Sequence, residues 1–209
     1  MIENTRIGVI GLGYVGLPLA CLFARLYKVK GFDCNEQKVK RLLTAKDDTC
    51  EVDDNTLKTL LSSGMHLTAK AEDLQDCNVY IVCVPTPVDA DNNPDLTPLI
   101  EASKTVGSLL KKGDIVIYES SVYPGCTEND CIPVLATESK LEYNKDFFAG
   151  YSPERINPGD KQHTVENITK IVSGSTPQTA DFVEKLYGSV LKNGTCKASS
   201  IKVAEAAKV

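Results

Sequence analysis

The sequence predicts an α/β fold of the doubly wound type, in which helices cover both faces of a mainly parallel sheet. Three observations support this prediction. Apolar, β-rich runs alternate with helical segments, a glycine-rich turn follows the first run, and residues 79–84 are continuously apolar. A continuously apolar run is typical of a central strand that is buried on both faces.

The alternation defines the expected elements in order. We expect strands at residues 6–10, 29–33, 66–68, 79–84, 114–118, 147–151, 170–173 and 195–198. Helices are expected at residues 14–26, 36–44, 55–63, 97–110, 128–139 and 177–187. Asn35 is the predicted N-cap of its helix, and Gly113 is expected to close the helix at 97–110.

The turn after the first strand has the pattern G-x-G-x-x-G, formed by Gly11, Gly13 and Gly16. Such spacing allows a tight turn, a close approach of backbone to a pyrophosphate, and close packing of helix on strand. The following helix N-terminus offers free N–H groups to phosphates. Asp33 ends the next strand, where a ribose 2′-hydroxyl would be held. The order predicts a Rossmann-type dinucleotide site, the alternative being a glycine-rich turn of another α/β protein.

Composition limits the possible partners. The 209 residues suit one large domain, or one domain plus part of another. The net charge of -5 without a basic stripe argues against nucleic acid as the main partner. Glycines and a proline interrupt the apolar residues 7–24, so no membrane span is expected there. The first residues lack the shape of a signal peptide, which predicts a cytoplasmic location.

The eight cysteines contain no C-x-x-C pair, and only two histidines accompany them. This pattern favours neither zinc nor a disulfide framework. We therefore expect no metal, and we expect all eight cysteines to be small buried hydrophobes.

Polar loops follow the later strands, at the sheet edge where ligands of doubly wound proteins bind. Pro85-Thr86-Pro87 would hold the Thr86 hydroxyl against a cofactor, or would only end the strand before it. Residues 119–125 and 152–160 carry hydroxyls and charged groups, although turn residues alone also account for such loops. The pair Glu154-Arg155 lies between two prolines, and a turn does not require that pair.

The last ten residues begin a strong helix pattern, with Ser200 as the predicted N-cap, and the pattern is still running at Val209. We expect residues 1–198 to form the dinucleotide-binding domain. Residues 199–209 are expected to be the truncated start of a long central helix.

Five blocks together resemble, in this order, the N-terminal half of the UDP-glucose/GDP-mannose dehydrogenase family, over essentially the whole chain. The blocks are Gly11-Leu12-Gly13-Tyr14-Val15-Gly16-Leu17-Pro18, Val84-Pro85-Thr86-Pro87, Tyr151-Ser152-Pro153-Glu154-Arg155, Val172-Ser173-Gly174 and Ala204-Glu205-Ala206-Ala207-Lys208. Within the family, residues 118–125 and 152–160 look most like the UDP-N-acetylhexosamine 6-dehydrogenases of the Vi-antigen type, which act on UDP-GlcNAc or UDP-GalNAc.

The resemblance implies a four-electron oxidation of the sugar C6 alcohol to a carboxylate with two NAD⁺, for surface-polysaccharide precursors. In the family a cysteine captures the intermediate aldehyde, a second hydride leaves, and water hydrolyses the thioester. The resemblance also implies that the full-length enzyme is a homodimer assembled largely through the central helix. NAD is favoured over NADP because the Asp33 carboxylate would repel a 2′-phosphate.

The resemblance also implies roles for individual residues. Cofactor contacts are expected from Gly11, Leu12, Gly13, Tyr14, Val15, Gly16, Asp33, Lys38, Val84, Pro85, Thr86, Pro87 and Ser121. Ser121 would help to place the catalytic water, Glu154 would act as acid and base in hydrolysis, and Lys208 would favour a developing oxyanion. Substrate contacts are expected from Glu154, Arg155, Ile156, Asn157 and Lys208.

The chain departs from the family pattern in two respects. Pro158 stands where glucose-specific members carry a second glutamate, which favours a substrate other than UDP-glucose. The family's nucleophilic cysteine belongs to a G-x-C-x-P-K-D-like motif, and none of the eight cysteines has one; Cys126 lacks the Pro-Lys-Asp that should follow. The active-site asparagine one turn past Lys208 is also absent. We therefore expect this chain to carry only part of an active site.

Three alternatives remain open from the sequence. The substrate can be UDP-glucose or UDP-N-acetylmannosamine within the same family. The chain can be another Rossmann enzyme, such as a β-hydroxyacid dehydrogenase, which shares the glycine turn but not residues 152–155. It can also be a non-catalytic NAD-binding module.

Overall fold

The computed structural model describes residues 2, 4–88, 91, 93–154 and 165–208. One sheet organises this part of the chain, with its eight strands in the order β3-β2-β1-β4-β5-β6-β7-β8. The strands are β1 (Arg6–Ile10), β2 (Lys28–Phe32), β3 (His66–Thr68), β4 (Val79–Val82), β5 (Ile115–Tyr118), β6 (Phe148–Tyr151), β7 (Lys170–Gly174) and β8 (Thr195–Lys197). Neighbours pair in parallel, except that β7 runs antiparallel to β6.

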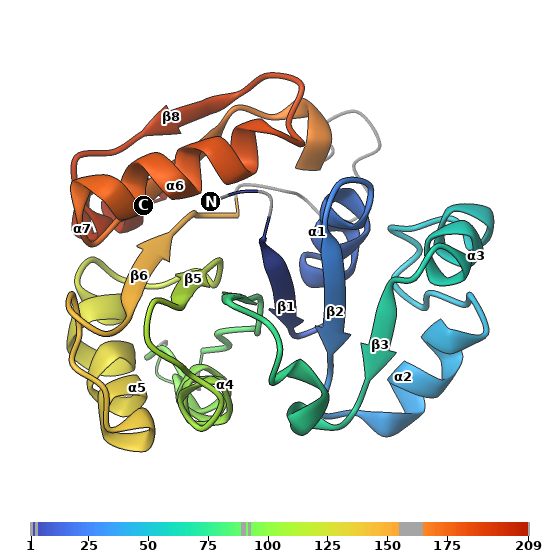
Figure 1. Cartoon of the computed structure of the whole chain (residues 1–209), viewed down its shortest axis with the longest axis horizontal. Helices are drawn as coiled ribbons and strands as arrows, with labels where there is room; N and C mark the ends of the chain where they lie inside the picture. Colours follow the sequence, from blue (N-terminus) through green and yellow to red (C-terminus); the bar gives the residue numbers. More distant parts are fainter. Residues whose placement is uncertain (1, 3, 89–90, 92, 155–164, 209) are drawn as a thin grey trace.

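Helices lie on both faces of the sheet, as the sequence predicts (Figure 1). The helices are α1 (Gly16–Ala24), α2 (Glu36–Leu43), α3 (Asp54–Ser62), α4 (Thr97–Gly107), α5 (Ile132–Ser139), α6 (Pro177–Gly188) and α7 (Ile201–Ala206). Two 3-10 turns, η1 (Ala71–Leu74) and η3 (Val165–Asn167), and one π-helical turn, η2 (Thr127–Cys131), complete the described elements. The expected doubly wound, mainly parallel α/β fold is confirmed.

Each face of the sheet has its own apolar core. Successive residues of a strand point to opposite faces, so Ile7 and Val9 of β1 pack with α1, α2, α3 and α6, whereas Ile10 packs with α4, α5 and α7. All four residues of β4 and of β5 are buried, which agrees with their continuously apolar sequence.

The observed helix ends differ from the predicted ones for identifiable reasons. The first helix begins at Gly16 rather than Tyr14, because the glycine turn occupies the preceding residues. Helix α4 ends at Gly107 and has Ser108 as its C-cap, so the prediction that Gly113 closes it is wrong. Gly113 instead has φ +92° in the turn before β5, where its N–H donates to the Asp146 carbonyl over 2.6 Å. The predicted caps Asn35 and Ser200 are confirmed, since each accepts a backbone N–H three residues on.

The helix expected at residues 128–139 is two pieces, the π-helical turn η2 and the α-helix α5. Pro133 has no N–H to give to the carbonyl four residues before it, and this missing donor accounts for the wider turn just ahead of the proline. Four strands are also shorter than predicted: β4 ends at Val82 and β8 at Lys197, while β5 begins at Ile115 and β6 at Phe148.

The prediction that all eight cysteines are buried is wrong for three of them. Cys21, Cys77, Cys83, Cys126 and Cys131 are buried, whereas Cys34, Cys50 and Cys196 are exposed, and all eight are free thiols. Cys34 and Cys50 lie in loops, and Cys196 lies on the edge strand β8, so no second layer of structure covers them as it covers the central strands. No helix in residues 2, 4–88, 91, 93–154 and 165–208 is long and apolar enough to cross a bilayer.

Candidate active site

A cavity of about 390 Å³ opens where the chain reverses its winding, between β1 and β4. The last residues of five strands lie in register at this edge of the sheet, in the order Phe32, Ile10, Val82, Tyr118 and Tyr151. The cavity is lined by the segments that leave those strands: Gly11, Gly13, Tyr14, Val15, Asp33, Lys38, Cys83, Val84, Pro85, Thr86, Pro87, Glu119, Ser120, Ser121 and Glu154. Ligands of doubly wound proteins bind in this crevice.

The three motif glycines differ in what surrounds them. Gly11 has φ +92°, a conformation that side chains disfavour. A Cβ atom added at Gly16 would lie 1.8 Å from the Gly11 carbonyl oxygen, so the helix can dock only with glycine there. A Cβ at Gly13 would meet no atom within 4 Å. The open space over Gly13, beside the first N–H groups of α1, fits a bound pyrophosphate.

Asp33 joins the glycine turn to the end of β2. Its Oδ2 accepts the Leu12 N–H over 3.0 Å, and its Oδ1 accepts the Asn35 N–H over 2.9 Å. Lys38 Nζ lies 2.7 Å from Oδ2. The predicted ribose acid and the predicted basic contact are therefore an ion pair on the cavity wall.

We expect Asp33→Ala to weaken NAD⁺ binding at least about tenfold, because a hydrogen bond to a charged group contributes about 1.5–3 kcal/mol. Calorimetric titration of the chain with NAD⁺ measures the change. Asp53→Ala is the matched control, since Asp53 also accepts a backbone N–H, from Thr56 over 2.9 Å, but does so at the N-cap of α3. Equal affinities in wild type and Asp33→Ala would show that Asp33 does not anchor the ribose.

Two hydroxyl hydrogen bonds tie the loop after β4 to the loop after β5. Thr86 Oγ1 donates to the Ser121 carbonyl over 2.6 Å, and Ser120 Oγ donates to the Val84 carbonyl over 2.6 Å. Tyr151 OH donates to the Ser120 carbonyl over 3.0 Å, which fixes the second loop to β6. The Thr86 hydroxyl therefore holds a neighbouring loop as well as lining the cavity, and the Ser121 side chain is exposed there.

The segment after β6 brings two of the predicted catalytic residues together. Lys208, just past the end of α7, donates from Nζ to the main-chain carbonyl of Glu154. The Glu154 side chain is nearly buried and lines the cavity, and its Oε1 has no hydrogen-bond partner in the part of the chain that the structure describes. The predicted substrate residues Arg155, Ile156 and Asn157, with Pro158, lie outside the described residues.

Beneath the cavity a buried ionic cluster joins the predicted Glu154 to Lys170 and Glu119, which are absent from the predicted site residues. Lys170 Nζ lies 2.6 Å from Glu119 Oε2 and 3.4 Å from Glu154 Oε2, and both the lysine and Glu119 are fully buried. Tyr187 OH donates to Glu119 Oε1 over 2.5 Å. The sequence signal for Lys170 is a lysine at the start of the apolar strand β7.

Burial governs the protonation of this cluster. It raises the pKa of Glu119 to about 7, although Lys170 acts in the opposite direction. Burial alone would lower the pKa of Lys170, but the carboxylates of Glu119 and Glu154 outweigh it and the lysine pKa stands above its usual value. The lysine therefore carries its charge beneath the cavity.

Cys83, in the cavity wall, and Cys126, in the loop after β5, are both poor nucleophiles. Burial raises the pKa of the Cys83 thiol well above its ordinary value. A hydrogen bond with Cys131, together with burial, raises the pKa of Cys126. The thiolate is the reactive form, so both thiols are poorly suited to attack a carbonyl. No group of three or more potential metal ligands is found among the described residues.

A further buried acid, Glu205, holds α7 against the loop after β5. Glu205 is fully buried, and its carboxylate accepts the N–H of Gly125 over 2.5 Å and that of Thr127 over 2.9 Å. Thr127 is the first residue of η2, so the negative charge also lies at a helix N-terminus, where it is favoured.

The fold and cavity define a Rossmann-type dinucleotide-binding domain. Residues 5–191 match the model of the UDP-glucose/GDP-mannose dehydrogenase family, NAD binding domain. The chain therefore belongs to this family and is its NAD-binding domain.

Known proteins resemble the chain over nearly all of its length. It is 57% identical over 207 residues to UDP-N-acetyl-D-glucosamine 6-dehydrogenase of Pseudomonas aeruginosa, covering 99% of this chain and 49% of that protein. It is 51% identical over 208 residues to the enzyme of the same name from Salmonella typhi, covering 100% of this chain and 48% of that one. The crystal structure of UDP-D-ManNAc dehydrogenase from Pyrococcus horikoshii superposes with a TM-score of 0.88 at 35% identity, over 96% of this chain and 48% of that one. The chain spans about half the length of the relatives it matches.

Proposed function

We propose that this chain is the NAD-binding half of a UDP-N-acetylhexosamine 6-dehydrogenase, which oxidises the C6 alcohol of UDP-GlcNAc or UDP-GalNAc to the carboxylate for surface-polysaccharide precursors. The observation that carries the proposal is the cavity that joins the glycine turn to Ser121 and Glu154. The identity to two UDP-N-acetyl-D-glucosamine 6-dehydrogenases supports the substrate class.

The proposed reaction converts one alcohol, one water and two NAD⁺ into one carboxylate, two NADH and three protons. Bound NAD⁺ supplies the hydride acceptor. Gly11, Gly13 and the start of α1 would hold its pyrophosphate, and Asp33 its adenosine ribose. Thr86 and Ser121 would lie on the nicotinamide side, where their two loops are already joined by a hydrogen bond.

Glu154 is the proposed acid and base of the hydrolytic step, and its cavity-lining carboxylate with one unpartnered oxygen supports this role. The positive charge of Lys208 would stabilise an oxyanion that develops next to the Glu154 segment. Arg155, Ile156 and Asn157 are proposed substrate contacts on the sequence resemblance alone. The nucleophilic cysteine would come from the half of the enzyme that follows residue 209.

Two wider features belong to the same proposal. Residues 1–198 are proposed as the cofactor domain and residues 199–209 as the start of a central helix, through which the full-length enzyme forms a homodimer. We also propose a cytoplasmic location, and the three exposed free cysteines support a reducing compartment.

The test is a titration followed by an assay. We expect the 209-residue chain to bind NAD⁺ by calorimetry but to form no NADH with UDP-GlcNAc or UDP-GalNAc, because it lacks the cysteine motif. The longer reading frame is expected to turn over at least one of the two sugars. Turnover by the 209 residues alone would place a nucleophile within this chain. Oxidation of a 3-hydroxyacid, but of no UDP-sugar, by the longer enzyme would refute the substrate class.

A further inference from the structure

The buried lysine beneath the cavity is fully satisfied by three acceptors. Lys170 Nζ donates to Glu119 Oε2 over 2.6 Å, to the Pro153 carbonyl over 3.2 Å and to Glu154 Oε2 over 3.4 Å. An ammonium group has three donors, so none remains. Lys170 thus contacts both the side chain of Glu154 and the main chain immediately before it.

The strand direction explains how Lys170 reaches this position. Strands β1, β2, β4, β5 and β6 present their last residues to the cavity edge, but β7 is antiparallel to β6, with Tyr151 opposite Ser173. The first residue of β7, rather than its last, therefore lies at the edge that carries the site. A lysine at this position is fully buried, and its two carboxylate partners offset the free-energy cost of removing the ammonium group from water.

The two oxygens of the Glu154 carboxylate have different surroundings. Oε2 faces Lys170, whereas Oε1 is buried without a hydrogen-bond partner in the described residues, on a side chain that lines the cavity. A buried polar atom of this kind calls for a partner, which a bound water or substrate hydroxyl in the cavity would supply.

We propose that Lys170 is a positioning residue for the chemistry at Glu154: it holds Oε2 and the preceding main chain so that Oε1 points to the reacting atoms, and Glu119 holds Lys170 in turn. The inference rests on the proposed function, in which Glu154 exchanges protons with water or substrate. Tyr187 completes the arrangement by fixing the other oxygen of Glu119.

An ion pair that only stabilised the fold would have the same geometry. The test therefore needs to measure the pKa of a group in the cluster as well as the stability of the chain. The groups that face Lys170 are Glu119 after β5, Glu154 after β6, Tyr187 on α6 and Cys83 after β4. Among them Glu119 is the reporter, because its pKa is raised to about 7 by burial and responds to both Lys170 and Glu154.

The first experiment uses the 209-residue chain and needs no activity. We expect the carboxyl ¹³C NMR signal of Glu119 to titrate at least about half a pH unit lower in Glu154→Gln, because a like charge is removed. In Lys170→Met the midpoint is expected to move upward instead. Glu154→Gln preserves the shape of the site, so it keeps the test available if Lys170→Met does not fold. An unchanged Glu119 midpoint in Glu154→Gln would overturn the inference.

The second experiment uses the longer enzyme and the double variant Lys170→Met/Glu119→Gln, which removes both charges of the 2.6 Å ion pair and leaves Glu154 without its cation. We expect kcat to fall at least about tenfold, while KM for the UDP-sugar and Kd for NAD⁺ stay within about twofold.

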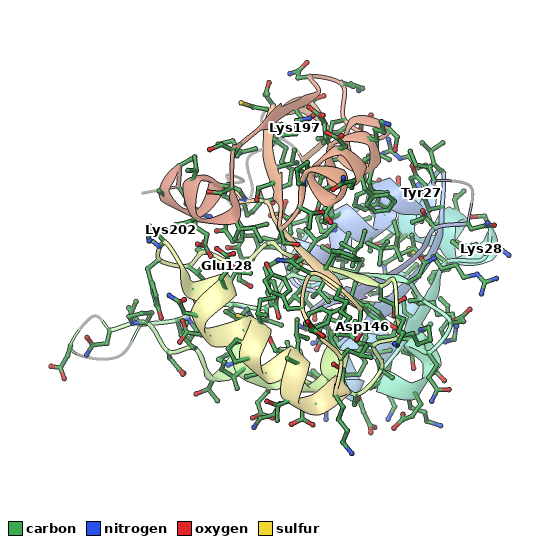
Figure 2. All side chains as sticks on the ribbon, turned by 60° about the vertical axis from the view of Figure 1, so that its left-hand side comes forward. Tyr27, Lys28, Glu128, Asp146, Lys197 and Lys202 are labelled. Carbon is green, nitrogen blue, oxygen red and sulfur yellow. The ribbon has the colours of Figure 1, made fainter. Side chains whose placement is uncertain are left out.

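Lys197→Met is the matched control, since Lys197 is also a strand lysine with two carboxylate partners, Asp181 at 2.7 Å and Glu184 at 2.8 Å. Lys197 lies on the outer strand β8 (Figure 2) and does not line the cavity, so the kcat of Lys197→Met should equal that of wild type. A folded double variant with wild-type kcat would contradict the inference.

The outcomes separate this inference from the proposed function. Coupled titration of Glu119 with Glu154, but no turnover of any UDP-N-acetylhexosamine by the wild-type longer enzyme, would refute the function and support the carboxylate arrangement. Turnover without the coupling would refute the role of Lys170 and leave the function standing.

Discussion

Gly16→Ala is expected to destabilise the chain by at least about 3 kcal/mol and to abolish NAD⁺ binding. The added Cβ would lie 1.8 Å from the Gly11 carbonyl oxygen and 3.0 Å from Cys83 Cβ, and the first contact is with backbone that cannot turn aside. Helix α1 would have to move away from the end of β1, taking the phosphate-binding turn with it. Urea unfolding measures the loss of stability, and calorimetry measures the loss of affinity.

Gly13→Ala distinguishes the two roles of the glycine motif, helix packing and close approach of the pyrophosphate. Gly13 has no positive φ, and a Cβ there would meet nothing within 4 Å, so we expect stability within about 0.5 kcal/mol of wild type. The same methyl would occupy the space that a pyrophosphate needs, and we expect Kd for NAD⁺ to rise at least about tenfold. A stable Gly16→Ala variant, or full affinity in Gly13→Ala, would contradict the assignment of packing to one glycine and ligand approach to the other.

Several strand bounds and helix caps could be predicted from the sequence because they depend on nearby residues. The strands at 6–10 and 66–68 are predicted to the residue, and Asn35 and Ser200 cap their helices as expected. These features depend on neighbouring residues only. The prediction that Gly113 ends α4 failed because glycine marks a left-handed position without saying whether a helix or a strand adjoins it.

The candidate site was predictable wherever it follows a parallel strand. The rule that ligands bind at carboxyl ends led to Asp33, to Thr86 and to the loops that carry Ser121 and Glu154, whose individual roles came from the family resemblance. All four residues line one cavity. The rule could not find Lys170, because the antiparallel direction of β7 brings an amino end to the same edge. A lysine at the first position of an apolar strand does not indicate a site residue until the direction and register of that strand are known.

Glu205 illustrates a second limit, because its partners lie about eighty residues away in the sequence. We expect Glu205→Leu to destabilise the chain by about 4 kcal/mol, since the N–H groups of Gly125 and Thr127 would both stay buried without an acceptor, at about 1–3 kcal/mol each, and α7 would lose its tie to the loop. Urea unfolding measures the change.

Two further variants make the Glu205 prediction specific. Glu205→Gln keeps one carbonyl oxygen but turns an amide donor toward the other N–H, so its loss should lie between those of wild type and Glu205→Leu. Lys202→Leu is the control on the same helix: Lys202 is exposed (Figure 2), and we expect a change within about 0.5 kcal/mol. If all three variants unfolded at the same urea concentration as wild type, the carboxylate would not be what fastens α7. Because that helix ends two residues before Lys208, and the loop it holds carries Ser121, losing Glu205 should also displace two proposed catalytic groups.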